Sequence, residues 1–411
     1  MPASAGRPVR RVVLARLLRG FADGLVSVLL ATYLSGLGFS PFQVGAIVTG
    51  TLIGSAALTL AVGLLAQGRP HRTVLLAASA LMALTGLGFA TSSAFWLVLA
   101  VAVAGTLNPT AGDVSLFLPT EQAYLADRVD PPGRPRLYAR YNLAGSLAGA
   151  VGALVSAAPE RLSDATGWSL TTSQRLGFVV YSLVAVTIAL LYRGLPEDQP
   201  PAAGDPAPGR LRPRRPRRIV VELAALFSLD SAAGGLVVTS LLVLWLKLRF
   251  DLDTATTGAV FFAAGLLTGS SQLLAGPLAA RIGLIRTMSF THLPANLALA
   301  LAAFAPTPGL AVGLLLVRSA LSQMDVPARQ AFVMAVVPPD ERAAAASITN
   351  VPRSLASATT PLLAGALLSR STFGWPLLLA GLAKATYDIL LLVLYRHVPE
   401  TPGAARTPTP R

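Results

Sequence analysis

Acidic and basic residues stand inside stretches of the sequence that are otherwise apolar. Arg19 and Asp23 are four residues apart, so they share one face if their stretch is helical. A carboxyl group that is removed from water holds a proton more readily, whereas a neighbouring guanidinium favours its ionised form. Asp23 is therefore a candidate proton carrier, and a permanent structural ion pair with Arg19 is the alternative.

The most polar stretch within an apolar run lies at 108–115, where Pro109 and Pro119 bracket Asp113. Its polar members are Asn108, Thr110, Asp113 and Ser115. Two prolines in one helix break its hydrogen-bond ladder, and broken helices at membrane depth are tolerated where they line a cavity or pack on protein. The stretch is a candidate part of a solute path, and a kinked, packed helix is the alternative.

The elements that must position these residues are membrane-spanning helices. Of 411 residues, 53% are hydrophobic and 13% are charged, about half the charged fraction of a soluble domain. The apolar residues form runs long enough to span a bilayer, and without strand-type alternation these runs indicate helices rather than a barrel. The twelve runs are 12–38, 41–66, 72–91, 94–126, 135–158, 175–193, 219–248, 254–280, 283–305, 308–336, 343–369 and 373–397.

The net charge of +14 is best explained by membrane topology rather than by nucleic-acid binding. Arginines gather in alternate connections, most densely between Arg210 and Arg218, while the other connections are nearly bare. By the positive-inside rule, both termini are cytoplasmic in a multi-pass protein of the plasma or inner membrane. The tryptophans Trp96, Trp168, Trp245 and Trp375 all fall at the predicted outer side, where the membrane interface favours them.

The two halves of the chain resemble each other. PTEQA at 119–123 returns as PARQA at 327–331, 208 positions later, with Glu121 replaced by Arg329. The Pro- and Arg-rich segment 193–218 separates six runs from six and is typical of a cytoplasmic linker. The predicted organisation is a six-helix half at 1–192, the linker at 193–218, a second six-helix half at 219–398 and a disordered tail at 399–411. Such repeats in a polytopic chain favour a transporter with its site between the halves.

With this plan the sequence resembles the major facilitator superfamily over its whole length. The family's motif between helices two and three, Gly-x-Leu-x-Asp-Arg-x-Gly-Arg-Arg, is matched by Gly63, Leu65 and Arg72, although Gln67 replaces the Asp. A second copy at 276–286 retains its Gly, Leu and Arg positions, with Ala280 in place of the acid. The resemblance implies an all-α integral membrane fold of twelve helices, in two six-helix repeats around a central cavity.

The glycines of "GSLAGAVG", in helix five, partly match a motif of the family's drug–proton antiporters. They are Gly145, Gly149 and Gly152, with Ala150 where that motif has Pro. Close helix packing through small residues is the alternative interpretation.

In this family, helices one, four, seven and ten line the cavity, which extends the candidates into the second half. Proton coupling is expected at Asp23, Asp113 and Asp230. The expected substrate cavity comprises Arg19, Asn108, Thr110, Asp113, Ser115, Arg318, Gln323 and Asp325.

The exchanged charge of the repeated pentapeptide suggests a cytoplasmic gate. Glu121 and Arg329 would lie at equivalent places in the two halves, where opposite charges can pair as that side closes. Arg140 and Arg353 would complete this gate, and pairing within each half is the alternative. Lys384 and Asp388, four residues apart in the last run, are predicted to form a structural pair.

No catalytic constellation, Walker loop or cysteine occurs in the sequence, so neither an enzyme nor direct use of ATP is expected. His71, His292 and His397 lack metal-ligand spacing, and no metal or other cofactor is expected beyond a proton gradient. The expected function is secondary active transport of a small molecule by a monomer in the lipid bilayer, with proton-driven export favoured. A proton symporter or uniporter for a nutrient, and a non-transporting sensor or lipid-handling protein, are the alternatives.

Overall fold

A computed structural model describes residues 3–65, 69–110, 116–126, 128–129, 134–196, 218–336 and 342–396 of the chain. Within these residues every regular element is a helix, which confirms the predicted all-α class. Residues 197–217, which are most of the predicted linker at 193–218, lie outside the described residues, as do the predicted tail at 399–411, Asp113 and Ser115.

The helices follow the apolar runs closely. In chain order they are α1 (Ala3–Gly36), α2 (Pro41–Leu65), α3 (His71–Thr91), α4 (Phe95–Ala104), α5 (Phe117–Ala126), α6 (Arg134–Val155), α7 (Ala158–Thr166), α8 (Leu170–Arg193), α9 (Arg218–Gly235), α10 (Thr239–Phe250), α11 (Thr254–Ile282), α12 (Leu284–Ala302), α13 (Pro308–Leu321), α14 (Asp325–Val336), α15 (Arg342–Arg370) and α16 (Trp375–Tyr395).

Three of the predicted runs are each divided into two helices. The fourth run gives α4 and α5, the seventh gives α9 and α10, and the tenth gives α13 and α14. With α7 as a short extra helix, the described helices therefore group into the twelve segments of the predicted fold.

By length and apolar composition, seven helices of the described residues could cross a membrane, or eight if α9 and α10, which bend by 41°, make one span.

The prolines of the repeated pentapeptide explain where two of the broken segments resume. Pro119 is the third residue of α5, and Pro327 is the third residue of α14. The first turn of a helix leaves its N–H groups without intrahelical partners, so a residue that lacks an N–H is tolerated there. Both copies of the motif therefore begin a new helix after a break.

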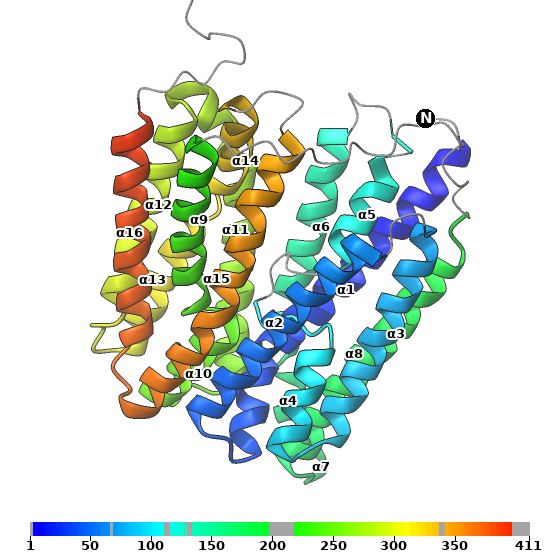
Figure 1. The fold of residues 1–411 in the computed structure, drawn as a ribbon. Coiled ribbons are helices and arrows are strands. Elements are labelled where there is room, and N and C mark those ends of the chain that lie inside the picture. Colours follow the sequence, from blue (N-terminus) through cyan, green and yellow to red (C-terminus); the bar gives the residue numbers. More distant parts are fainter. Residues whose placement is uncertain are drawn as a thin grey trace, which may run out of the picture.

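The helices form two bundles, α1–α8 and α9–α16, that join toward one end and part toward the other (Figure 1). The main contacts between bundles are those of α2 with α15 and of α6 with α11. A Cβ atom on Gly45 of α2 would lie 2.6 Å from the carbonyl oxygen of Pro361 and 2.9 Å from the Cα atom of Gly365, both on α15. The two backbones therefore touch where these glycines meet.

A polar contact also joins the bundles at the closed end. Glu160 of α7 accepts hydrogen bonds from the backbone N–H groups of Thr254, at 3.0 Å, and Ala255, at 3.2 Å. These groups lie in the first turn of α11, where N–H groups lack intrahelical partners and the helix dipole attracts negative charge. A carboxylate of the first bundle thus caps a helix of the second.

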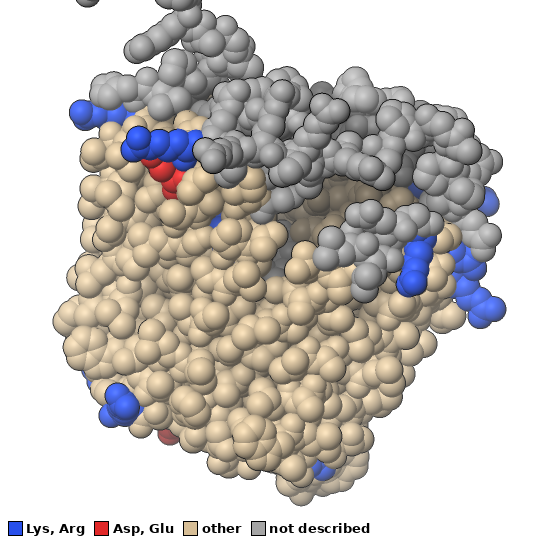
Figure 2. Space-filling view, viewed as in Figure 1, with Lys and Arg blue, Asp and Glu red and all other residues tan. Residues whose placement is uncertain are grey.

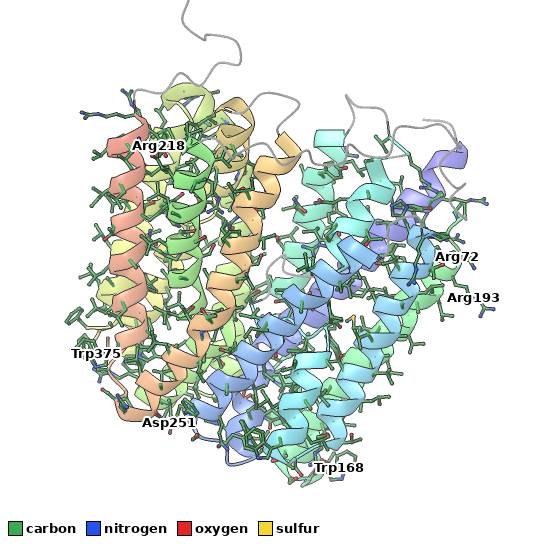
Figure 3. All side chains as sticks on the ribbon, viewed as in Figure 1. Arg72, Trp168, Arg193, Arg218, Asp251 and Trp375 are labelled. Carbon is green, nitrogen blue, oxygen red and sulfur yellow. The ribbon has the colours of Figure 1, made fainter. Side chains whose placement is uncertain are left out.

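The outer surface has the charge distribution of a membrane protein. The middle of the face in Figure 2 carries almost no charged side chain. Figure 3 places Arg72 and Arg218 toward the parted end and Trp168 and Trp375 toward the closed end.

One of the four tryptophans differs from the others in its burial. Trp96, Trp168 and Trp375 are exposed, whereas Trp245 is fully buried. Trp245 is therefore held by the helices that α10 packs on, namely α1, α2 and α15, while its predicted place at the outer side stays a prediction.

The glycines of the fifth segment bring α6 against α1. A Cβ atom on Gly20 would lie 2.4 Å from the carbonyl oxygen of Gly145, and one on Gly24 would lie 1.9 Å from that of Gly149. Neither position has room for a side chain. The packing interpretation of the "GSLAGAVG" glycines is thus confirmed.

Candidate functional site

An ion pair lies at the centre of the first bundle. The Arg19 guanidinium of α1 donates to both carboxylate oxygens of Glu121 on α5, at 3.0 Å and 2.5 Å. The hydroxyls of Tyr141 on α6 and Tyr192 on α8 also donate to this carboxylate. The guanidinium carbon stands 4.6 Å from the ring centroid of Phe117. Four segments of the bundle are therefore tied together by one fully buried carboxylate.

The second bundle holds an ion pair of the opposite polarity. Asp230 of α9 accepts from Arg329 of α14 at 3.2 Å and from Lys384 of α16 at 2.6 Å. Arg329 also pairs with Asp325, one turn earlier, at 3.4 Å, and its guanidinium lies 5.6 Å from the ring centroid of Phe227. This cluster is buried as well.

The two clusters explain the exchanged charge in the repeated pentapeptide. In the first bundle the base is on the first segment and the acid, Glu121, is on the fourth. In the second bundle the acid is on the seventh segment and the base, Arg329, is on the tenth. Both partners have changed sign, so each half retains its own pair, and the two polarities are opposite.

The four predicted gate residues are not brought together in this state. Glu121 and Arg329 belong to separate bundles, and each forms an ion pair with a residue of its own bundle. This agrees with the alternative interpretation, in which the charges pair within each half. Arg353 of α15 donates to the hydroxyl of Ser231 at 3.0 Å and to the side chain of Asn350 at 3.3 Å. A gate that forms when the parted end closes remains a prediction.

The fourth gate residue, Arg140 of α6, lies at the parted end of the first bundle. It lines a cavity of about 290 Å³ together with Arg10 and Arg128. The walls between these arginines are apolar and include Val9 and Leu137.

Of the predicted proton carriers, Asp23 and Asp230 are described and both are buried. Arg19 bonds Glu121 and the two tyrosines rather than Asp23, which is one turn away on the same helix. The alternative, a permanent ion pair between Arg19 and Asp23, is therefore not formed in this structure. Asp230 is held by two cations, Arg329 and Lys384, and both favour its ionised form.

Of the predicted cavity residues of the fourth segment, Asn108 and Thr110 are described, and both lie between α4 and α5. The side-chain oxygen of Asn108 accepts from the hydroxyl of Thr110 at 2.7 Å and from its N–H at 3.1 Å, which stabilises a turn. The carbonyl oxygen of Thr110 accepts from the hydroxyl of Thr239 at 3.1 Å. Ser240, also in the first turn of α10, donates to the carbonyl oxygen of Ser27 at 2.8 Å. The break in the fourth segment therefore meets the break in the seventh, across the two bundles.

The remaining predicted cavity residues lie at the break in the tenth segment. Arg318 is in the last turn of α13, and its buried Nε atom has no hydrogen-bond partner. Gln323 is in the turn that follows, and Asp325 begins α14. The tenth segment is thus interrupted at residues that the sequence marks as polar, whereas the seventh is interrupted at the apolar residues 236–238.

A third buried polar cluster, in the second bundle, was missed by the sequence reasoning. The Nδ1 atom of His292, in mid-α12, lies 2.9 Å from a carboxylate oxygen of Asp388 on α16. The predicted Lys384–Asp388 pair is wrong, because Lys384 reaches Asp230 on α9 instead. Spacing along one helix showed that the two could meet, but not that each faces a different neighbour. Among the described residues, no group of three or more His, Cys, Asp or Glu is placed to hold a metal.

Comparisons with known proteins agree with this architecture. The family model of the Major Facilitator Superfamily matches residues 12–317 and 223–411. An uncharacterized membrane protein of Saccharomyces cerevisiae is 23% identical over 96% of this chain and 95% of its own length.

Solved structures with the same fold include several transporters. The xylose transporter XylE of E. coli, in an inward-open conformation, aligns with a TM-score of 0.75 at 16% identity, covering 96% of this chain and 98% of that one. A D-xylose–proton symporter aligns with a TM-score of 0.74 at 17% identity over 95% and 98% of the two chains. A bacterial homologue of the human lysosomal transporter Spinster, in an inward-facing conformation, gives 0.70 at 12% identity over 96% of each chain.

Proposed function

Because the chain belongs to the major facilitator superfamily, we propose that it is a secondary active transporter that moves a small solute across a membrane by alternating access. The observation that carries the proposal is the pair of buried ion clusters of opposite polarity, each tying together several segments of one bundle. Ionisable groups at membrane depth are costly and are retained where they serve transport. Two bundles that join at one end only are the arrangement that such a cycle requires.

The orientation of the chain follows from its charges. With both termini in the cytoplasm of a cell bounded by this membrane, the parted end faces inward and the Glu160 contact with α11 faces outward. The described state is then inward-open. The protein acts as a monomer, since each chain carries both halves of the cycle.

Export driven by protons that enter the cell is the mode we favour, with Asp23, Asp113 and Asp230 as proton carriers. Proton symport is the second candidate, and the similarity to a D-xylose–proton symporter supports it. The substrate cavity includes Arg19, Asn108, Thr110, Asp113, Ser115, Arg318, Gln323 and Asp325. Coupling needs no ATP, metal or organic cofactor beyond the proton gradient.

Closing of the inner end is proposed to involve Glu121, Arg140, Arg329 and Arg353. In this transition the two ion pairs within the bundles would exchange partners across the bundles. Cysteine labelling from each side of the membrane tests this, because Glu121→Gln should then change the ratio of inward to outward accessibility. A ratio equal to that of the wild-type protein would leave the ion pairs with a structural role alone.

Everted membrane vesicles, acidified inside and loaded with a pH-sensitive dye, test the direction and the coupling. Antibiotics, dyes and metabolites are added one at a time, with Asp23→Asn as the variant and Asp253→Asn, in an exposed outer connection, as the matched control. Proton release that depends on a compound and on Asp23 supports antiport and identifies a substrate class. A response that survives Asp23→Asn moves the proton site to Asp113 or Asp230. Solute-dependent proton uptake in the reverse direction supports symport.

A further inference from the structure

A buried carboxylate in the second bundle has a histidine as its neighbour instead of a lysine or arginine. Asp388 of α16 lies 2.9 Å from Nδ1 of His292, and its other oxygen accepts from the side-chain amide of Asn296 at 2.8 Å. All three side chains are buried, and Asp388 is 1% exposed. Among the described residues, His292 is the one group in contact with this carboxylate that can become a cation.

The protonation state of this pair changes the buried charge. With a neutral imidazole and an ionised Asp388, the pair carries one uncompensated negative charge at membrane depth, which costs far more than it would in water. With an imidazolium, the pair is neutral overall and its hydrogen bond is charge-assisted. Histidine is also the side chain whose charge changes near neutral pH. Burial and geometry together therefore favour uptake of one proton.

The helices around α12 contribute a defined set of charges. Those that act on His292 are Asp325 of α14, Asp230 of α9, and Asp388 and Lys384 of α16. The neighbouring cluster balances itself, since Asp230 and Asp325 face Arg329 and Lys384 in direct ion pairs.

The other elements near α12 add few ionisable groups. Arg318 of α13 interacts with Asp230 rather than with His292. The aromatic ring of Tyr387 stands edge-on to the imidazole, with 6.2 Å between centroids. Arg353 of α15 acts on the Asp230 cluster, and α11 carries one ionisable side chain, Arg281, in its last turn.

We propose that His292 and Asp388 form a proton-binding site of the second bundle and that Lys384 controls its occupancy. Lys384 stands one turn from Asp388 on the same face of α16, and in this state it bonds Asp230 at 2.6 Å. When Asp230 no longer holds it, the ammonium can turn to Asp388 and supply the compensating charge. The imidazolium N–H bond then breaks, the proton passes to water, and the imidazole is left neutral. The proposal deepens the proposed transport function and rests on it for its role in the cycle.

The site can be tested without a substrate, by nuclear magnetic resonance of the full chain in lipid nanodiscs with ¹⁵N-labelled histidine. The sequence has three histidines, so the signal lost in His292→Gln identifies this one. We expect an imidazolium signal from His292 at pH 7 in the wild-type protein, and at least a tenfold loss of that signal in Asp388→Asn. A neutral His292 in the wild-type protein from pH 5 to pH 7 overturns the proposal, whatever Asp388→Asn shows.

Two further variants separate the control by Lys384 from general packing. Lys384→Met removes the competing cation, so the imidazolium should persist to a pH at which the wild-type signal has been lost. Identical titration of Lys384→Met and wild type would contradict the control by Lys384. Tyr387→Phe is the matched control, because its hydroxyl has no hydrogen-bond partner and its ring remains beside His292. The titration of His292 should be unchanged in this variant.

The result is independent of the transport assay. If His292 is an imidazolium but the chain shows no solute-dependent proton flux, the proton site stands and proton-coupled transport is refuted. Proton flux in a chain whose His292 stays neutral supports the transport function and refutes the site.

Discussion

Removal of the negative charge of Glu121 is the sharpest test of the buried ion pair in the first bundle. In Glu121→Gln, one carboxylate oxygen becomes an NH₂ group, which faces the Arg19 guanidinium, a group that can only donate, beside the hydroxyl of Tyr141 or Tyr192. The Arg19 guanidinium, 1% exposed, is left without its counter-charge. The variant should therefore lose much more stability than one hydrogen bond would supply.

The size of the loss follows from burial. Breaking a buried ion pair by removing one partner costs about 3–5 kcal/mol, because the remaining charge stays in a medium of low polarity. Removing one phenol hydroxyl, as in Tyr192→Phe, should cost about 1.5–3 kcal/mol, the range for hydrogen bonds to charged groups. In Arg19→Met/Glu121→Gln no isolated charge remains, so the double variant should lose less than the sum of the single losses.

Equilibrium unfolding in mixed micelles measures these free energies of unfolding. The matched control is Glu222→Gln, since the Arg218–Glu222 pair has an N–O distance of 2.6 Å, close to the 2.5 Å of Arg19–Glu121, but its side chains are 93% and 42% exposed. This control should unfold like the wild-type protein, because water already solvates both charges. Equal losses in Glu121→Gln and Glu222→Gln would refute the argument from burial, as would strict additivity of Arg19→Met and Glu121→Gln.

Three further perturbations address the closed end. Gly45→Val places a side chain where α2 touches the backbone of α15, so the two bundles should separate there. Accessibility to cysteine labelling from the outer side should then rise severalfold. Unchanged labelling would show that the glycine contact is dispensable. Glu160→Gln weakens the cap of α11 and should likewise raise outward accessibility, whereas Glu222→Gln should not. The hydrogen bond from Thr256 lowers the pKa of Asp253, so its contribution to the first turn of α11 is present above the ordinary carboxyl pKa and is lost as pH falls below about 4. The protection of that turn against hydrogen exchange, relative to the intrinsic rate at each pH, should therefore fall in acid in the wild-type protein. It should fall less in Asp253→Asn, which retains a capping side chain. Equal acid sensitivity would assign the effect to another group.

Much of the fold could be predicted from the sequence because lipid leaves few choices. Each apolar run must satisfy its own backbone hydrogen bonds, so run length and the absence of alternation determine helices. Run boundaries, the positions of arginines and the repeated pentapeptide were enough to predict twelve segments in two halves. Pro109 and Pro119 also indicated that the fourth segment is broken.

The partners of the buried charges depended on the tertiary structure. The sequence placed Arg19 beside Asp23 and Lys384 beside Asp388, four residues apart in each case, yet Arg19 bonds Glu121 and Lys384 bonds Asp230. Spacing along one helix limits which groups can meet, whereas the choice among them is made by the helices packed against that face. His292 gave no signal for the same reason, since its partner, Asp388, is 96 residues away in the sequence and meets it only when α12 and α16 pack together.

The sequence by itself determined that this chain is a twelve-segment membrane protein built from two related halves, because apolar length and charge placement are properties of the chain alone. Only the tertiary structure decided that the exchanged charges of Glu121 and Arg329 are each balanced within their own half. Ion pairing falls off steeply with distance and depends on burial, and both are set by how the helices pack rather than by the order of residues.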